Sequence, residues 1–307
     1  MGLKTNAGLK LLALLIGIAA LFAGINWYQH RFVRTDTDLI RLLPGGDATV
    51  FYAQADVLRR TGMLNVLAGS KTAQETDYQA FVRATHFDYL KDIDAVAGST
   101  FNNDLFLAVK GRFDWGRIGN YVREQGGSCA ADNCQLPGSG SGAWIATVRI
   151  QPDVLGIAFG NDKTLSHAIH PGQQAIAPPL PSEPVWIRLA PSLLKNPAAL
   201  PVALRIFLIS MQSANAVTIA AAAAPSASPD AFEIKLDAQC PSAATADTIR
   251  QQLQIDTKML KLELAHEHQE PNPADLTGLL TSGNFATNGN VVTGVWPVSK
   301  ALLKTLQ

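Results

Sequence analysis

Nineteen consecutive residues near the start of the chain, Leu11–Gln29, carry no charged side chain. The first part of this run, Leu11–Ile25, contains only apolar residues and glycine. As an α-helix, a run of this length spans about 28 Å, close to the roughly 30 Å hydrocarbon core of a bilayer. Trp27 and Tyr28 close the run, and such aromatic rings prefer the membrane interface. We therefore predict a transmembrane helix that contacts the lipid bilayer through residues 9–29.

Three interpretations of this run are open: a retained signal anchor, a cleaved signal peptide and a buried core helix. Cleavage requires small residues in an A-x-A pattern, and the best match, Leu21-Phe22-Ala23, begins with a large one. A core helix would carry a periodic polar face, which the run lacks. We expect a signal anchor, with residues 1–30 as cytoplasmic tip and membrane helix and residues 31–46 as a polar stalk.

Cysteine spacing bears on which side of the membrane the rest of the chain lies. Lysines before the apolar run favour a cytoplasmic amino terminus, whereas arginines after it oppose that orientation. Cys129 and Cys134 are separated by four residues, a spacing that permits a hairpin-closing disulfide, which persists only in an oxidising compartment. They could instead be two unrelated thiols; a zinc site would need a second ligand pair, and only Cys240 remains. We expect a single-pass protein of the cell inner membrane, with its C-terminal domain in the periplasm or outside the cell.

Charge is distributed unevenly, although the formal net charge of the chain is zero. Residues 1–46 contain five basic and two acidic side chains, so the remainder of the chain is mildly acidic. Without a run of lysine and arginine, this remainder lacks the basic surface that nucleic-acid binding requires, and we expect no nucleic-acid partner. Apolar residues make up 47% of the chain, enough for a core, which excludes global disorder.

The order of expected elements repeats after residue 46. Residues 176–184 contain four prolines, cannot be helical and form a linker between residues 47–175 and 185–307. Each half reads as a strand, a helix, two strands with alternating apolar residues, a second helix, a hairpin and a short final helix. The matching segments are Val50–Arg60 with Val185–Lys195, Asp94–Phe101 with Ala214–Ala224, Asp104–Phe113 with Asp230–Gln239, and Trp144–Phe159 with Asn284–Trp296.

The repeat predicts an α+β fold in which a transmembrane helix precedes two diverged copies of a β-α-β-β-α-β-β-α module. We expect two antiparallel sheets with helices on one face, and helix N-caps at Asp56, Asp114 and Ser242. One segment is ambiguous, because the alanines at 220–224 favour helix by propensity while the repeat assigns a strand. The apolar stretch 196–213 fits either a helix packed on the sheet or an exposed contact surface.

Three segments, LLPGGDATVFYAQADVLRRTGML, FDYLKDIDAVAG and KGRFDW, resemble a set of uncharacterised bacterial proteins, often acidobacterial. Members of that set have an N-terminal signal anchor and an α+β extracytoplasmic region. The resemblance covers mainly residues 40–125. It implies a membrane-anchored α+β protein, and it implies no activity, substrate or site residue.

Two histidine pairs are candidate metal ligands. His266 and His268 flank Glu267, but residues two apart on a helix point about 200° apart, so the two rings cannot share one ion there. His167 and His170 are three apart and could share a face, although only two ligands are visible. We interpret both pairs as solvated residues near helix ends and expect no metal site.

Other candidate chemistry is equally sparse. Ser192 and Lys195 fit the S-x-x-K pattern of acylating serine enzymes, but no K-T-G partner sequence is present. Asp88, Asp92 and Asp94 could form an acidic patch, yet they lack the ligand spacing of a cation-binding loop. We interpret the serine–lysine pair as part of the repeat and the acidic residues as a helix-to-strand turn.

With no catalytic motif, no cofactor-binding fingerprint and no candidate catalytic residue, we expect a non-enzymatic protein without cofactors. The favoured function is protein interaction or assembly in the cell envelope, through an unknown envelope protein partner. This function predicts an exposed apolar patch, with Leu200–Met211 as the candidate. The alternative is a small-molecule or lipid-binding extracytoplasmic module, with its cavity between the two halves or under residues 61–91.

Overall fold

The computed structural model describes residues 33, 35–60, 64, 76–172, 180–196, 202–223 and 232–305. The strands are β1 (Thr49–Ala53), β2 (Ile93–Phe101), β3 (Asp104–Gly111), β4 (Ser128–Ala130), β5 (Asn133–Pro137), β6 (Trp144–Gln151), β7 (Val154–Gly160), β8 (Val185–Leu189), β9 (Ala216–Ala223), β10 (Phe232–Gln239), β11 (Asn284–Asn288) and β12 (Val291–Val298). The α-helices are α2 (Ala55–Arg60), α5 (Thr76–Thr85), α6 (Tyr89–Asp92), α7 (Trp115–Glu124), α8 (Pro191–Lys195), α9 (Val202–Ser210), α10 (Ala243–His266), α11 (Leu276–Thr281) and α12 (Lys300–Thr305), and the 3-10 helices are η1 (Asp36–Leu42) and η2 (Leu165–Ala168).

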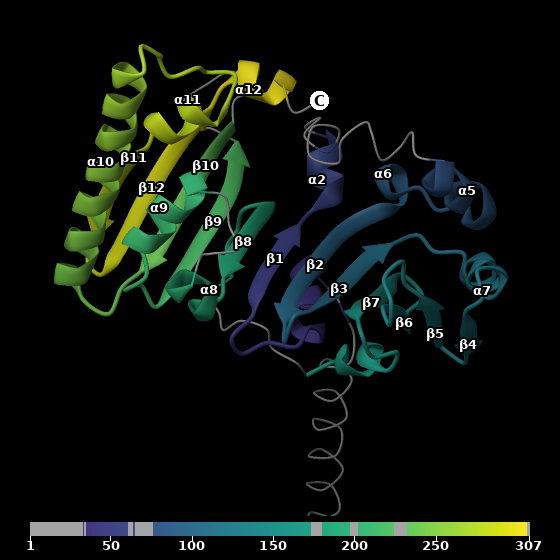
Figure 1. Ribbon diagram of the computed structural model, residues 1–307. Coiled ribbons are helices and arrows are strands. Elements are labelled where there is room, and N and C mark those ends of the chain that lie inside the picture. The colour runs from purple at the N-terminus through teal and green to yellow at the C-terminus, as the bar shows by residue number, and fades with distance from the viewer. Residues whose placement is uncertain are drawn as a thin grey trace, which may run out of the picture.

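All twelve strands belong to one antiparallel sheet, in the order β11-β12-β10-β9-β8-β1-β2-β3-β7-β6-β5-β4 (Figure 1). The expected α+β class with antiparallel pairing is therefore confirmed. The expectation of two separate sheets is wrong, because β1 pairs with β8 and joins the halves edge to edge. Outward from this central pair, the first half continues as β2, β3, β7 and β6, and the second half as β9, β10, β12 and β11.

The alanine-rich segment forms a strand, β9, as the repeat predicted. It pairs along its length with β10 on one side and with β8 on the other. Each neighbouring strand supplies backbone partners that a helix at this position would lose. Tertiary pairing therefore overrides the helix propensity of alanine.

We call the pairing of β1 with β8 the seam between the halves. Further hydrogen bonds join the two halves at both ends of this ladder. The Gln54 N–H donates to the Pro184 carbonyl at 2.7 Å, and the Ala190 N–H donates to the Thr49 hydroxyl at 3.0 Å. Between these bonds, Trp186 is only 2% exposed. Each half thus completes the hydrogen bonding of the other.

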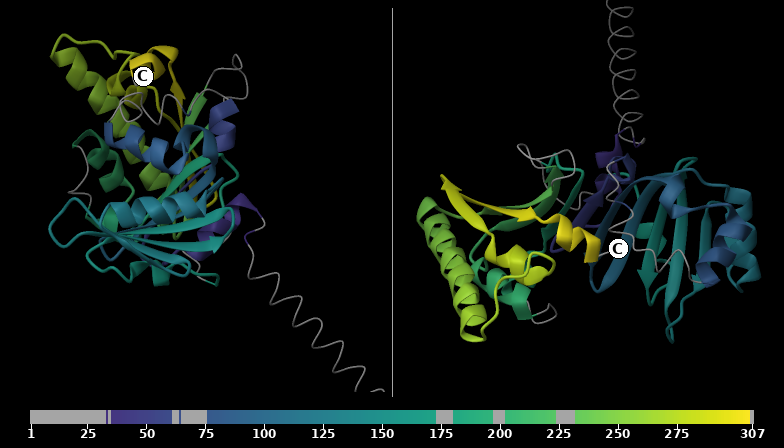
Figure 2. Two further views of the ribbon diagram at one scale, coloured as in Figure 1. Left: turned by 90° about the vertical axis from the view of Figure 1, so that its right-hand side faces the viewer. Right: turned by 90° about the horizontal axis from the view of Figure 1, so that it is seen from above.

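The two faces of the sheet are covered differently in the two halves. Helices α8, α9, α10 and α11 pack on one face of the second half, around buried Leu194, Phe207 and Leu253. In the first half, η1 and η2 pack on the opposite face. Figure 2, viewed from above, shows η1 and α10 on opposite sides of the sheet. The expectation of helices on one face therefore holds for the second half alone.

Part of the expected polar stalk belongs to the folded core. Leu39 and Leu43 are fully buried, and Ile40 is only 1% exposed, because η1 turns all three onto the first half of the sheet. The stalk assignment of residues 31–46 is thus wrong for this helix. The apolar residues of this segment alternate closely with charged ones in the sequence. The segment therefore reads as polar overall, although the 3-10 helix places its apolar side chains on one side.

The expected membrane anchor, residues 9–29, lies outside the described residues. Among the residues that the structure describes, no helix is both long enough and apolar enough to span a bilayer.

Candidate functional site

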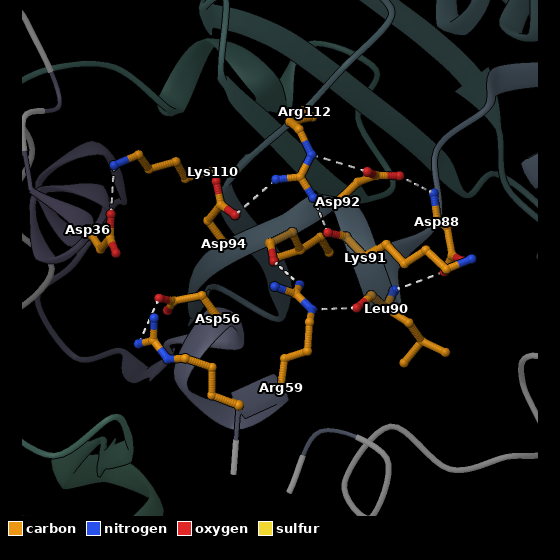
Figure 3. Close-up of polar contacts among 12 residues, drawn as sticks. Asp36, Asp56, Arg59, Asp88, Leu90, Lys91, Asp92, Asp94, Lys110 and Arg112 are labelled. Atoms are coloured by element: carbon orange, nitrogen blue, oxygen red, sulfur yellow. Dashed lines mark hydrogen bonds and ion pairs between the residues drawn. The ribbon is translucent and has the colours of Figure 1, made fainter. Parts of the chain in front are cut away.

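The three aspartates of the expected acidic patch are held in a polar network near the start of β2 (Figure 3). Arg112, which follows β3, approaches Asp92 at 3.3 Å and Asp94 at 3.5 Å. Lys91 approaches Asp88 at 2.9 Å. Each carboxylate therefore has a cationic partner within the chain, as expected for a structural turn.

Hydrogen bonds around Asp88 favour its charged form. Burial raises the pKa of this carboxyl, but hydrogen bonds from Lys91, Tyr78 and the Leu90 N–H outweigh that effect, so its pKa lies below the ordinary value. Arg59, on α2, donates to the carbonyls of Leu90 and Ile93, at 2.7 and 2.6 Å. The network therefore links α2 and α6 to the start of β2, and it has a structural role.

The serine–lysine pair also has a structural role. Ser192 lies in the first turn of α8, and its N–H donates to Asp47 Oδ1 at 3.0 Å. Hydrogen bonds from the backbone and side chain of Ser192 lower the pKa of Asp47. Asp47, which precedes β1, thus caps a helix of the second half, and this contact adds a further fastening to the seam.

The histidine pairs lie near helix ends, as expected. His266 is the last residue of α10, and His268 follows with a left-handed backbone, φ 55°. His167 lies in η2, and the His170 N–H donates to the Leu42 carbonyl at 3.1 Å, which links the ends of the two 3-10 helices. In the described part of the chain, no group of three or more histidine, cysteine, aspartate or glutamate side chains could hold a metal ion.

A groove of about 350 Å³ lies on the face of the second half opposite α8, α9, α10 and α11, where the described residues form no helix. Its floor is a row of polar side chains that lie opposite one another on four neighbouring strands: Arg188, Thr218, Asp237 and Thr293. Residues 180–183, which belong to the expected linker, form one wall, where Glu183 lies 3.6 Å from Lys235. Sequence reasoning missed this groove, because its residues come from segments far apart in the chain.

Two floor residues of the groove carry opposite charges in partly desolvated positions. Burial lowers the pKa of Arg188, an effect that the charge of Asp237 opposes. Desolvation raises the pKa of Asp237, while Arg188 lowers it and Glu183 adds to the rise. The Arg188 Nε also donates to the Thr218 hydroxyl at 3.1 Å, so the arginine is held against the floor. Such an arrangement can bind a small polar molecule.

An apolar stripe on α10 is the second exposed feature of the second half. We define the apolar stripe as Ile255, Met259 and Leu262, whose exposed fractions are 52%, 59% and 55%. Their spacing of four and three residues places them on one face of the helix. The face of α10 that packs on the sheet carries other apolar residues, among them Ile249 and Leu253. The stripe is therefore not used for folding.

Helix α9 lies beside α10, the helix that carries the apolar stripe (Figure 1). The Ser210 hydroxyl at its C-terminal end donates to Asp256 on α10 at 2.5 Å. The adjacent Ile209 is 51% exposed and adds apolar surface beside α10. The candidate patch at 200–211 is otherwise wrong among the described residues, because Phe207, Leu208 and Met211 are buried on the sheet. The exposed apolar surface therefore lies mainly on α10.

Cys129 and Cys134 lie at bonding distance and close the β4–β5 hairpin, where they are directly opposite each other. Cys240 is a buried free thiol, and burial raises its pKa. The disulfide joins the last two strands at one edge of the sheet, which otherwise form a short ladder.

Replacing both Cys129 and Cys134 with alanine is expected to destabilise this hairpin by about 2 kcal/mol, a value at the low end because the closed loop is short. Hydrogen exchange should show faster exchange at the amides of β4 and β5 and unchanged exchange in β9 and β10. Reductant should reproduce the effect in the wild-type chain and have no effect on the double variant. Equal exchange in oxidised and reduced wild-type chain would contradict this prediction.

No protein-family model matches this chain, and no curated protein matches it. Solved structures of TP0453 are similar to it. Crystal form I has a TM-score of 0.47 at 12% identity, over 87% of this chain and 95% of that chain. Crystal form III has a TM-score of 0.45 at 12% identity, over 87% and 96%, and crystal form IV has 0.43 at 10%, over 87% and 95%.

Proposed function

We propose that this chain is a non-enzymatic, membrane-anchored envelope protein that acts by binding another protein. The observation that carries the proposal is the apolar stripe on α10. Three large apolar side chains, each more than half exposed on one helix face, cost solubility and contribute little to the fold. A protein surface is the ordinary occupant of such a stripe, since an amphipathic helix buries its apolar face in a groove or against another helix.

The proposed location rests on two features. The uncharged run Leu11–Gln29 supports a signal anchor in the cell inner membrane. The Cys129–Cys134 bond supports an oxidising compartment, the periplasm or the cell exterior, for the folded part. An interaction module there would be held beside the membrane, close to other envelope proteins.

We further propose that the two halves arose by duplication of one module. The support is the mirrored strand order on either side of the β1–β8 pair. Helices follow at equivalent places: α2 and α8 after the first strand of each half, α7 and α10 after the third. On this proposal, the long α10 with its apolar stripe is a specialisation of the second copy, because α7 has ten residues and α10 has twenty-four.

The second candidate function is small-molecule binding in the groove on the open face of the second half. The specific observation is the charged pair on the groove floor, Arg188 and Asp237, in partly desolvated positions. A small molecule with both a positive and a negative group would match this pair. The groove borders the seam, so the binding of such a molecule would also contact the linker segment that connects the halves.

One experiment separates the two functions: native mass spectrometry of the full-length chain, extracted from its own membranes in detergent. We expect an added protein mass that is lost in Met259→Glu. Gln254→Glu is the matched control, because it adds the same charge to an exposed position of the same helix outside the stripe. This control should keep the added mass.

Two other results of this experiment would contradict the assignment of protein binding to the apolar stripe. A small added mass that is lost in Asp237→Asn and kept in Met259→Glu would favour the groove function instead. An added protein mass that both glutamate variants retain would show that the partner binds elsewhere, and the apolar stripe would then lose its assigned role.

A further inference from the structure

This inference rests on the proposed function, in which the apolar stripe binds a protein. The charged residues beside the stripe indicate which protein binds there. Along α10, Gln252, Ile255, Met259, Leu262 and His266 recur at alternating steps of three and four residues and are all exposed. This is the a and d pattern of a heptad repeat, with Ile255 and Leu262 at d and Met259 at a. Such a seam is built to receive another helix of the same kind.

Lys258 and Glu263 lie on opposite flanks of this seam. In the heptad, Lys258 is a g position and Glu263 is the next e position. Both are exposed, and neither forms an ion pair with any residue that the structure describes. They are five residues apart on one helix and on different sides of it, so they do not face each other within one chain.

In a parallel pair of helices, a g residue faces the following e residue of the partner helix. Lys258 of one copy would then face Glu263 of the other, and the twofold axis would generate this ion pair twice. In an antiparallel pair, g faces g and e faces e, so like charges would meet. The charge pattern therefore selects a second copy of this chain in parallel orientation.

The neighbouring helix α9 is compatible with this arrangement. Asp256, the e position one heptad before Glu263, is turned toward α9 and accepts hydrogen bonds from Ser210 and Gln252. This contact leaves the a and d positions uncovered. Ile209 at the end of α9 adds apolar surface on the same flank.

We infer that two copies of this chain associate through parallel packing of their α10 helices, with Ile255, Met259 and Leu262 in the seam and reciprocal Lys258–Glu263 ion pairs. The seam extends over about two heptads, so the contact is weak in dilute solution. Anchoring both copies in one membrane would raise their effective concentration and make a small contact sufficient.

The test is disulfide crosslinking of full-length Leu262→Cys in membranes of the expressing cells, under mild oxidation. Residues at d face their counterparts in a parallel pair, within the Cα separation that a disulfide spans. The native cysteines do not interfere, because two are bonded to each other and Cys240 is buried. We expect a crosslinked species of twice the chain mass. Lys261→Cys, an exposed neighbour outside the seam, is the control and should crosslink at least about fivefold less.

Charge reversal in the Leu262→Cys background tests the orientation. Lys258→Glu and Glu263→Lys should each reduce the crosslinked fraction about fivefold, because each places like charges across the seam. The double reversal should restore the fraction to near its starting value. If the ion pairs do not form between copies, the single reversals will not reduce the crosslinked fraction and the double reversal will have nothing to restore.

Absence of the crosslinked dimer, or a double reversal as defective as the single ones, would overturn the inference. If a different protein still adds its mass in a Met259-dependent manner, the proposed function stands and only the second copy is excluded. If the full-length chain without a dimer instead binds added phosphatidylglycerol vesicles through Met259, both the inference and the protein-binding function are excluded.

Discussion

Replacing Trp186 with alanine is expected to destabilise the folded chain by about 3–5 kcal/mol, the range measured for large aromatic truncations in protein cores. Trp186 is the second residue of β8, is 2% exposed and packs against Tyr52 of β1 with 5.9 Å between ring centroids. The cavity would open at the seam, where β1 and β8 supply the only ladder between the halves among the described residues. Urea unfolding of the purified chain, followed by circular dichroism, measures the loss.

Trp186→Phe is the matched control for this prediction. The Nε1 of Trp186 has no hydrogen-bond partner among the described residues, so phenylalanine gives up no hydrogen bond and keeps most of the ring volume. We expect a loss below about 1.5 kcal/mol. If the alanine variant were as stable as the phenylalanine variant, the ring would not be a packed part of the seam.

Two leucines on α10 should differ sharply in what they contribute to stability. Leu253 is fully buried against the second half of the sheet, and its replacement by alanine is expected to cost about 2–5 kcal/mol. Leu262, 55% exposed in the apolar stripe, should change stability by no more than about 0.5 kcal/mol when replaced by alanine. Urea unfolding of both variants at low protein concentration, where copies do not associate, gives the comparison.

The same substitution on the same helix removes helix-propensity differences from this comparison, because both variants exchange leucine for alanine. A loss of more than about 2 kcal/mol for Leu262→Ala would show that the apolar stripe is part of the fold. The interaction role assigned to it would then have no support. If only Leu253→Ala lowers the free energy of unfolding, the apolar stripe is not needed for folding and is available for binding.

Element order was predictable from sequence because each element carries its own local signal. Asp114 and Ser242 cap α7 and α10 as predicted, since the capping residue precedes each apolar run directly. Asp56 was predicted as a cap but lies inside the first turn of α2, where it pairs with Arg60 at 3.1 Å. The error is two residues, because the helix begins at Ala55, and it reflects how little the sequence distinguishes a cap from an early helical position.

Features formed by distant segments could not be predicted in the same way. The merging of two sheets into one depends on the pairing of β1 with β8, and neither strand carries a signal for its edge partner. The groove floor depends on register, which places Thr218 opposite Asp237 across β9 and β10. Apolar residues recur along α10 in the sequence, but the sequence does not show which of them the fold buries. The structure distinguishes a buried face that contains Leu253 from an exposed face that contains Met259.

The β1–β8 pairing also sets a problem of timing for a chain made from its amino terminus. β1 ends at residue 53 and its partner β8 begins at residue 185, so about 130 residues separate their appearance. At roughly 5–20 residues per second, one edge of the first half stays unpaired for on the order of ten seconds. An open strand edge is a template for pairing with other chains. The chain is thus most prone to aggregation after β1 is made and before β8 is made. A chaperone that binds an extended strand would protect the chain most during this interval.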